Sequence, residues 1–278
     1  MSYCKLNAGP YVVYNGATRI GVAPHYMKRG TTVVVRTKIC GISRARHALA
    51  AWEAGADLIG LMFALSQRRI TPEEGAKIVT MVKERHPMPV QEYPVQMIGL
   101  EPARPTTRPW ETMPSTPAFV GVFVNQSYDE IMRTAECCRL DYVQLHGDET
   151  PEFCEKLGLP VIKAVRPLGP AAAEDCREYA EAGALLLFDT YTSDRYGGTG
   201  VLGNWALAAE LANLYPLILA GGLDADNVAA AIRIVQPWGV DVSSGVETYR
   251  AKDLEKIRAF IQAARSVIGP SHDRLCDG

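Results

Sequence analysis

Side chains that can transfer protons follow short apolar runs in this 278-residue sequence. The thiol of Cys40 follows the run at 32–39, and the carboxylate of Asp189 follows the run at 185–188. A thiolate can remove a proton, and a carboxylic acid can donate one if burial raises its pKa. Taken singly, Cys40 would more often be a small packing residue, and Asp189 would as often cap or bind a backbone turn as take part in chemistry. Whether they form a site depends on the elements that position them.

Two glycine-containing segments indicate an anion site. Gly221-Gly222 follows one apolar run and Ser243-Ser244-Gly245 follows the next. Glycine lets backbone amides approach a ligand, and free amides beside a short helix bind phosphate. We add Gly198, from the glycine-rich segment 197–200, to this phosphate-binding set. The alternative is that these glycines only make tight turns.

Eight short runs rich in apolar and β-branched residues alternate with amphipathic segments of helical spacing. The expected strands are 32–39, 58–63, 118–124, 142–145, 161–165, 185–188, 217–220 and 239–242. The expected helices are 43–54, 72–85, 127–138, 152–156, 171–182, 204–214, 225–235 and 252–268. Eight such units predict the α/β class and a (β/α)₈ (TIM) barrel, with an open doubly wound sheet as the rival.

Several expected helices begin with recognisable capping residues. Thr71-Pro72 and Thr150-Pro151 each place a capping hydroxyl before a proline, which suits a first turn. Ser127, three residues before Glu130, is a capping-box pattern.

A single barrel domain is expected over 32–268, preceded by an extension at 1–31 and followed by a tail at 269–278. The segment 86–117 holds eight of the 18 prolines, a density that excludes a helix or a central strand. It is therefore predicted to be an irregular insertion between the second helix and the third strand. A helix-to-strand loop lies opposite the catalytic face of a barrel, so no catalytic role is expected.

The bulk composition excludes several classes of protein. With 29 basic and 31 acidic residues, the net charge of −2 gives no reason to expect nucleic-acid binding. No apolar stretch approaches the ~18 residues of a membrane span, and the start lacks a signal-peptide pattern. The seven cysteines are odd in number and show no metal-ligand spacing, so we expect reduced thiols in the cytoplasm and no metal. No nucleotide-binding motif is present, and no cofactor is expected.

An ordered set of motifs over roughly 35–265 resembles the phosphoribosylanthranilate isomerase family of tryptophan biosynthesis. Its members here are Lys38–Ile42, Gly55–Gly60, Gly121–Asn125, Val143–Asp148, Ile162–Val165, Phe188–Thr190, Gly197–Gly200, Leu219–Leu223 and Val240–Glu247. The resemblance implies an Amadori rearrangement, in which N-(5-phosphoribosyl)anthranilate becomes the 1-deoxyribulose ketose. It also implies Cys40 as general base and Asp189 as general acid.

The resemblance suggests substrate-binding roles for three further residues. Arg68, two residues after Ser66, would bind the anthranilate carboxylate, although Arg69 beside it competes for this role. Asp241 would face the substrate near its amine or make a structural bond in its turn. His146 is included in the substrate-binding set as a weaker candidate, since it would more often support the site from behind or simply be a hydrogen-bonded residue of the barrel wall. The sequence departs from the family at Asn204, which can still cap a helix.

Two alternatives stay open at this point. The first is the histidine-pathway aminoaldose–ketose isomerase or a dual-substrate relative, although Cys40 replaces the aspartate usual there. The second is a non-catalytic barrel that binds a phosphorylated ligand. The expected partner is a phosphorylated small molecule, and the chain is expected to be a monomer or homodimer.

Overall fold

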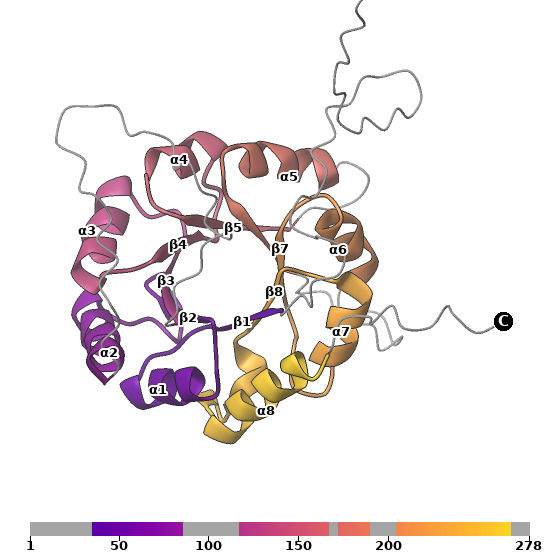
Figure 1. Cartoon of the computed structure of the whole chain (residues 1–278). Helices are drawn as coiled ribbons and strands as arrows, with labels where there is room; N and C mark the ends of the chain where they lie inside the picture. The colour runs from indigo at the N-terminus through magenta and orange to yellow at the C-terminus, as the bar shows by residue number, and fades with distance from the viewer. Residues whose placement is uncertain (1–34, 86–116, 167–171, 190–203, 268–278) are drawn as a thin grey trace, which may run out of the picture. The chain divides into compact units, whose positions relative to one another are not determined.

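The computed structural model describes residues 35–85, 117–166, 172–189 and 204–267, in which eight parallel strands form a closed barrel (Figure 1). The strands are β1 (Arg36–Ile39), β2 (Leu58–Met62), β3 (Ala118–Phe123), β4 (Tyr142–Leu145), β5 (Val161–Val165), β6 (Leu185–Asp189), β7 (Leu217–Ala220) and β8 (Gly239–Val242). They pair in chain order, and β8 pairs with β1. The rival open sheet is therefore wrong and the predicted barrel is confirmed.

A helix follows each strand, and Figure 1 shows these helices as a ring around the strands. They are α1 (Ala45–Glu53), α2 (Pro72–Arg85), α3 (Tyr128–Cys138), α4 (Pro151–Lys156), α5 (Ala172–Glu181), α6 (Trp205–Ala212), α7 (Val228–Val235) and α8 (Leu254–Arg265). Between β8 and α8 the chain adds a 3₁₀ turn (Ser244–Val246) and a small hairpin of β9 (Glu247–Thr248) and β10 (Ala251–Lys252). The sequence did not predict this hairpin.

The strands are covered on both faces, which explains their continuous apolar sequence. Every residue of β3 and β5 is buried. The helices bury only one stripe, as α8 does with Ile257, Phe260 and Ile261 at helical spacing. The core therefore has an inner part within the strands and an outer part between strands and helices.

The predicted helix starts are confirmed. Ser127 and Glu130 form a reciprocal capping box, and Thr150 caps α4 with proline at its first position. The backbone amide of Glu74 donates to the Thr71 hydroxyl at 3.3 Å, and the backbone amide of Thr71 donates to the Glu74 carboxylate at 2.8 Å. These bonds satisfy amides that a helix cannot pair internally, so they determine where each helix begins.

The predicted extension at 1–31, the tail at 269–278 and most of the insertion at 86–117 lie outside the described residues. The described flanks of the insertion, α2 and β3, are the elements expected on either side of it. Among the described helices, none is long and apolar enough to cross a membrane.

Candidate active site

The barrel brings the predicted strand-end residues to one mouth. All eight strands run parallel, so their carboxyl ends lie at the same face. Cys40 directly follows β1 and Asp189 ends β6, three steps away around the closed barrel by way of β8 and β7. Two groups that the sequence separates by almost 150 residues thus lie at the same face of the barrel, three strands apart.

Cys40 lies in a closely packed part of this mouth. It is buried, and its amide donates to the carbonyl of Val242 at 2.8 Å, which extends the pairing of β1 with β8. A Cβ placed on Gly60 of β2 would lie 2.8 Å from the Cys40 Sγ. Since real side chains do not approach so closely, glycine at position 60 leaves room for the thiol.

A fully buried lysine stands two residues before Cys40. The Nζ of Lys38 is 3.0 Å from Oδ1 of Asp241 on β8, and burial excludes Lys38 from solvent. Burial tends to lower the pKa of Lys38, but Asp241 and Cys40 outweigh it and raise the pKa above its usual value. Burial raises the pKa of Cys40, and the charge of Lys38 opposes that rise. Asp241 therefore makes a structural ion pair, whichever further role it has.

Arg68 reaches the same side of the mouth from the loop after β2. Its guanidinium forms a two-pronged ion pair with Glu247 at 2.6 and 2.8 Å. Lys252 also binds Glu247 at 2.8 Å, and donates to the Ser243 carbonyl at the same distance. Burial would raise the pKa of Glu247, but these two cations hold it below its usual value. The three side chains line a cavity of about 110 Å³.

Asp189, His146 and Arg166 form a second cluster on the opposite side. Oδ2 of Asp189 is 3.1 Å from the Arg166 guanidinium and 3.3 Å from Nε2 of His146. Arg166 also lies 3.0 Å from that imidazole nitrogen. The Arg166 side chain is 60% exposed, whereas that of Asp189 is 13% exposed. The carboxylate is therefore largely buried beside an arginine that borders solvent.

A buried ion pair fixes the turn that carries His146. Lys163 of β5 lies 2.8 Å from Glu149, and both side chains are almost fully buried. Glu149 accepts hydrogen bonds from the amides of Asn125 and Gly147, and Lys163 donates to the Gly147 carbonyl. The ends of β3, β4 and β5 are therefore tied together beneath His146.

The loops after β7 and β8, which hold the predicted phosphate-binding residues, contain glycines at positions that require this residue. Gly221 and Gly222 have φ angles of +93° and +69°, which residues other than glycine rarely adopt. A Cβ on Gly245 would strike the carbonyl of Leu223, so the two loops meet backbone to backbone. Ser243 precedes the short 3₁₀ turn that Ser244 begins. Gly198, the remaining residue of the predicted set, lies outside the described residues.

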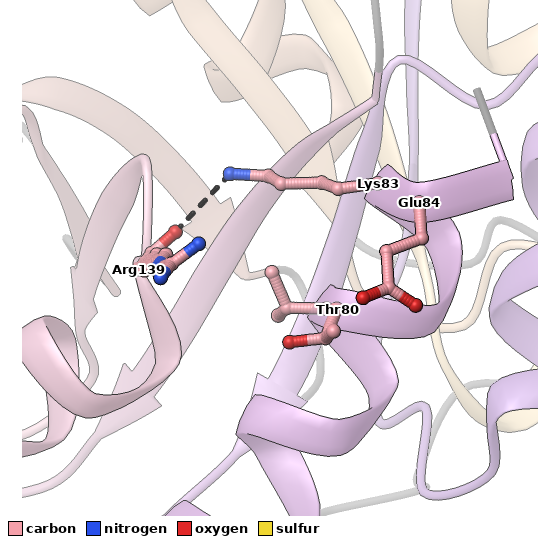
Figure 2. A pocket seen from close by; sticks show the side chains of 5 residues that line it. Thr80, Lys83, Glu84 and Arg139 are labelled. Atoms are coloured by element: carbon pink, nitrogen blue, oxygen red, sulfur yellow. Dashed lines mark hydrogen bonds between the residues drawn. The ribbon is translucent and has the colours of Figure 1, made fainter. Parts of the chain in front are cut away.

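A larger cavity of about 260 Å³ lies elsewhere, on α2 and the turn after α3 (Figure 2). Figure 2 shows Lys83 reaching toward Arg139, whose carbonyl it binds at 3.3 Å. Neither residue follows a strand, and Arg139 caps the C-terminal end of its helix. This cavity contains none of the predicted site residues, so we do not assign it to the chemistry.

The ionic partners of the site were not predicted from the sequence. Lys38 could have been predicted from the sequence. Residues two positions apart in a strand point to the same face, so a lysine two residues before Cys40 must lie on the same face as the thiol. Glu247 and Lys252 gave no such signal, since they reach the site through an unpredicted hairpin. Within the described part of the chain, no group of three or more histidine, cysteine or acidic residues could hold a metal ion.

The fold and the site define a (β/α)₈-barrel enzyme with acid–base groups at the carboxyl ends of its strands. The model of the N-(5′-phosphoribosyl)anthranilate (PRA) isomerase family matches residues 106–263. A Roseiflexus sp. (strain RS-1) N-(5′-phosphoribosyl)anthranilate isomerase is 42% identical over 234 residues, 84% of this chain and 99% of that protein. The chain therefore belongs to the phosphoribosylanthranilate isomerase family.

Solved structures agree with this assignment. Phosphoribosylanthranilate isomerase from Thermotoga maritima superimposes with a TM-score of 0.66 at 35% identity, covering 84% of this chain and all of that one. The enzyme from Thermus thermophilus gives 0.62 at 33% identity, covering 84% and 99%. A third structure is a complex with reduced 1-(o-carboxyphenylamino)-1-deoxyribulose 5-phosphate, with a TM-score of 0.64 at 33% identity over 84% of this chain and 100% of that one.

Proposed function

We propose that this chain converts N-(5-phosphoribosyl)anthranilate into 1-(2-carboxyphenylamino)-1-deoxyribulose 5-phosphate, with Cys40 as general base and Asp189 as general acid. The observation that carries the proposal is their placement at one barrel mouth, three strands apart, in a member of this family. A substrate held between them can receive a proton on one side and lose one on the other. The relative solved with the reduced product analogue supports the choice of substrate.

The proposed reaction begins with ring opening. Protonated Asp189 gives its proton to the furanose oxygen, the bond from C1′ to that oxygen breaks, and the nitrogen lone pair forms the C1′=N⁺ bond. This Schiff base acidifies the hydrogen on C2′. The Cys40 thiolate removes that proton, the C–H electron pair forms the C1′=C2′ bond, and the C1′=N⁺ electrons return to nitrogen. The resulting enolamine then tautomerises to the ketone: C1′ takes up a proton, the hydroxyl on C2′ loses one, and these two transfers return Cys40 and Asp189 to their starting protonation states.

Substrate binding in this proposal uses both polar ends of the molecule. Arg68 binds the anthranilate carboxylate, which would compete with Glu247 for the same two-pronged contact. The loops after β7 and β8 bind the phosphate, with Gly221, Gly222 and Gly245 supplying the close backbone approach and Ser243, Ser244 and Gly198 completing the set. His146 lies beside Asp189 and would contact the sugar.

The location and assembly of the protein are further parts of the proposal. We propose a cytoplasmic enzyme that acts as a monomer or a homodimer. A Thermotoga maritima relative is described as dimeric, with monomeric variants generated from it. Light scattering during gel filtration distinguishes the two assemblies, since a homodimer has twice the 30.3 kDa mass of the chain.

The test is the fluorescence of freshly prepared phosphoribosylanthranilate after addition of the purified chain. The proposal predicts a decay that depends on enzyme concentration and yields the ketose phosphate. Absence of turnover in a folded protein would contradict it. A parallel assay with the histidine-pathway aminoaldose tests dual specificity, and turnover of that substrate alone would favour the alternative isomerase.

A further inference from the structure

Lys38 is unusual among the residues of the barrel mouth because its charged amine is completely excluded from solvent. Burying an ammonium group is costly unless it is paired and hydrogen-bonded. Asp241 supplies one partner at 3.0 Å, on the neighbouring strand β8. An ion pair placed only for stability would gain little over apolar packing, so the buried charge of Lys38 is expected to have a second use.

The second partner of Lys38 is Cys40. Lys38 and Cys40 stand two residues apart on one strand and point to the same face. A Cβ on Gly60 would lie 2.8 Å from the Cys40 Sγ and 3.2 Å from the Lys38 Nζ, so these two atoms are at most 6.0 Å apart. Over this distance the positive charge of Lys38 favours the thiolate form of Cys40, and the thiolate in turn favours the charged form of Lys38.

Two other cations, Lys252 and Arg68, also act on Cys40, but each of them is already paired with Glu247. Lys252, from β10, acts on the thiol more weakly than Lys38 does. Its Nζ is held by Glu247 and the Ser243 carbonyl, both at 2.8 Å. Arg68 also interacts with Cys40, but its guanidinium is bound on two prongs by Glu247. Lys38 is therefore the cation that is both closest in sequence and strongest in effect on the thiol.

We propose that Lys38 is a positioning residue that acts through Cys40: its ammonium group stabilises the thiolate, and Asp241 holds that ammonium in place. The inference rests on the proposed role of Cys40 as base. Lys38 keeps its own protons throughout, because the proton taken up by the sulfur comes from C2′ of the substrate. Asp241 therefore contributes to the reaction through Lys38, with no contact to the substrate required.

The experiment follows alkylation of Cys40 by iodoacetamide as a function of pH, with the modified peptide quantified by mass spectrometry. This readout isolates Cys40 from the other cysteines and needs no substrate. In Lys38→Met, the loss of the cation should move the alkylation midpoint upward by about one pH unit, so that the rate at pH 8 falls about tenfold. Lys83→Met, on the outer surface at α2, is the matched control and should keep the wild-type profile.

A second variant predicts a shift of opposite sign. Asp241→Asn removes a negative charge that disfavours the thiolate, and the amide oxygen of the new side chain can still accept the Lys38 hydrogen bond that holds the ammonium in place. The alkylation midpoint should therefore fall and the rate at pH 8 should rise. This arm decides the question if Lys38→Met does not fold, as judged by circular dichroism and gel filtration.

Each outcome of these alkylation experiments either supports or contradicts the proposed role of Lys38. An upward shift in folded Lys38→Met with a downward shift in Asp241→Asn supports the proposal. An unchanged profile in folded Lys38→Met overturns it, as does an unchanged or upward profile in Asp241→Asn. Turnover gives an independent arm: Lys38→Met should lower kcat with KM little changed. If Cys40→Ser keeps full turnover while the alkylation shifts occur, then Cys40 is not the base, but Lys38 still controls its ionisation.

Discussion

The two sides of the barrel mouth are built differently. On the Cys40 side, Lys38 and Asp241 are buried and paired between adjacent strands, so their charges are fixed by the barrel wall. On the Asp189 side, the charges come from His146 and from the largely exposed Arg166, and they meet around one carboxylate oxygen. The charges beside Cys40 are therefore buried, whereas those beside Asp189 border solvent.

This difference matches the two proton transfers proposed. A base that takes a proton from carbon needs a fixed position and an environment that does not vary between turnovers. An acid must recover a proton before each cycle, and contact with exposed groups allows exchange with solvent. We therefore expect substitutions beside Asp189 to change mainly the protonation of the catalytic groups. Substitutions beside Cys40 should also disturb the packing of the barrel.

The largest effect is expected from Asp189→Asn, which removes the proposed acid but keeps its shape. General acid–base groups contribute roughly 10²–10⁴-fold, so kcat should fall by about that factor. Binding of a reduced product analogue should persist, because the amide fills the same space. Steady-state turnover and calorimetric titration measure the two quantities, and near-normal kcat would remove Asp189 from the mechanism.

The next largest effect is expected from Arg68→Met. A two-pronged contact to a charged group contributes about 1.5–3 kcal/mol, so KM should rise about ten- to a hundredfold. Arg69→Met is the matched control because Arg69 is exposed one position further along the same loop. If Arg69→Met raises KM and Arg68→Met does not, the carboxylate assignment moves to Arg69.

Gly60→Ala tests how tightly the buried side is packed. The added methyl group would lie 2.8 Å from the Cys40 sulfur, so Cys40 or Lys38 must move. Overpacking of this kind typically costs about 1–3 kcal/mol. Chemical denaturation should show that loss together with lower kcat. An unchanged free energy of unfolding would mean that the pair of side chains is looser than the structure indicates.

The smallest effect is expected from Arg166→Met on the open side. The side chain is largely exposed, so the free energy of unfolding should change by no more than about 0.5 kcal/mol. A cation beside a carboxylate favours its ionised form, whereas the proposed acid must be protonated. Removing Arg166 should therefore move the alkaline loss of kcat to higher pH. A shift to lower pH would contradict the arrangement.

The sequence predicted the barrel because its strands are covered on both faces and read as unbroken apolar runs. It also placed Cys40, Asp189, His146 and Asp241 at one mouth, since parallel strands end at the same face. The ion pairs were out of reach, because Lys38–Asp241 and Arg68–Glu247 join residues about 200 and 180 positions apart. Register between β1 and β8 creates the first pair, and the unpredicted hairpin at 247–252 contributes the second.

The measurement that tests the central claim most directly is the turnover of phosphoribosylanthranilate by Cys40→Ser, with Cys137→Ser as control. Cys137 is exposed on α3 and should be replaceable without effect. The serine hydroxyl is a far weaker acid than a thiol, so loss of the thiolate should lower kcat roughly 10²–10⁴-fold while analogue binding survives. Burial raises the pKa of Cys40, so wild-type kcat/KM should also rise with pH above neutrality as the thiol ionises. Equal turnover by Cys40→Ser and Cys137→Ser would contradict the role of Cys40 as the base.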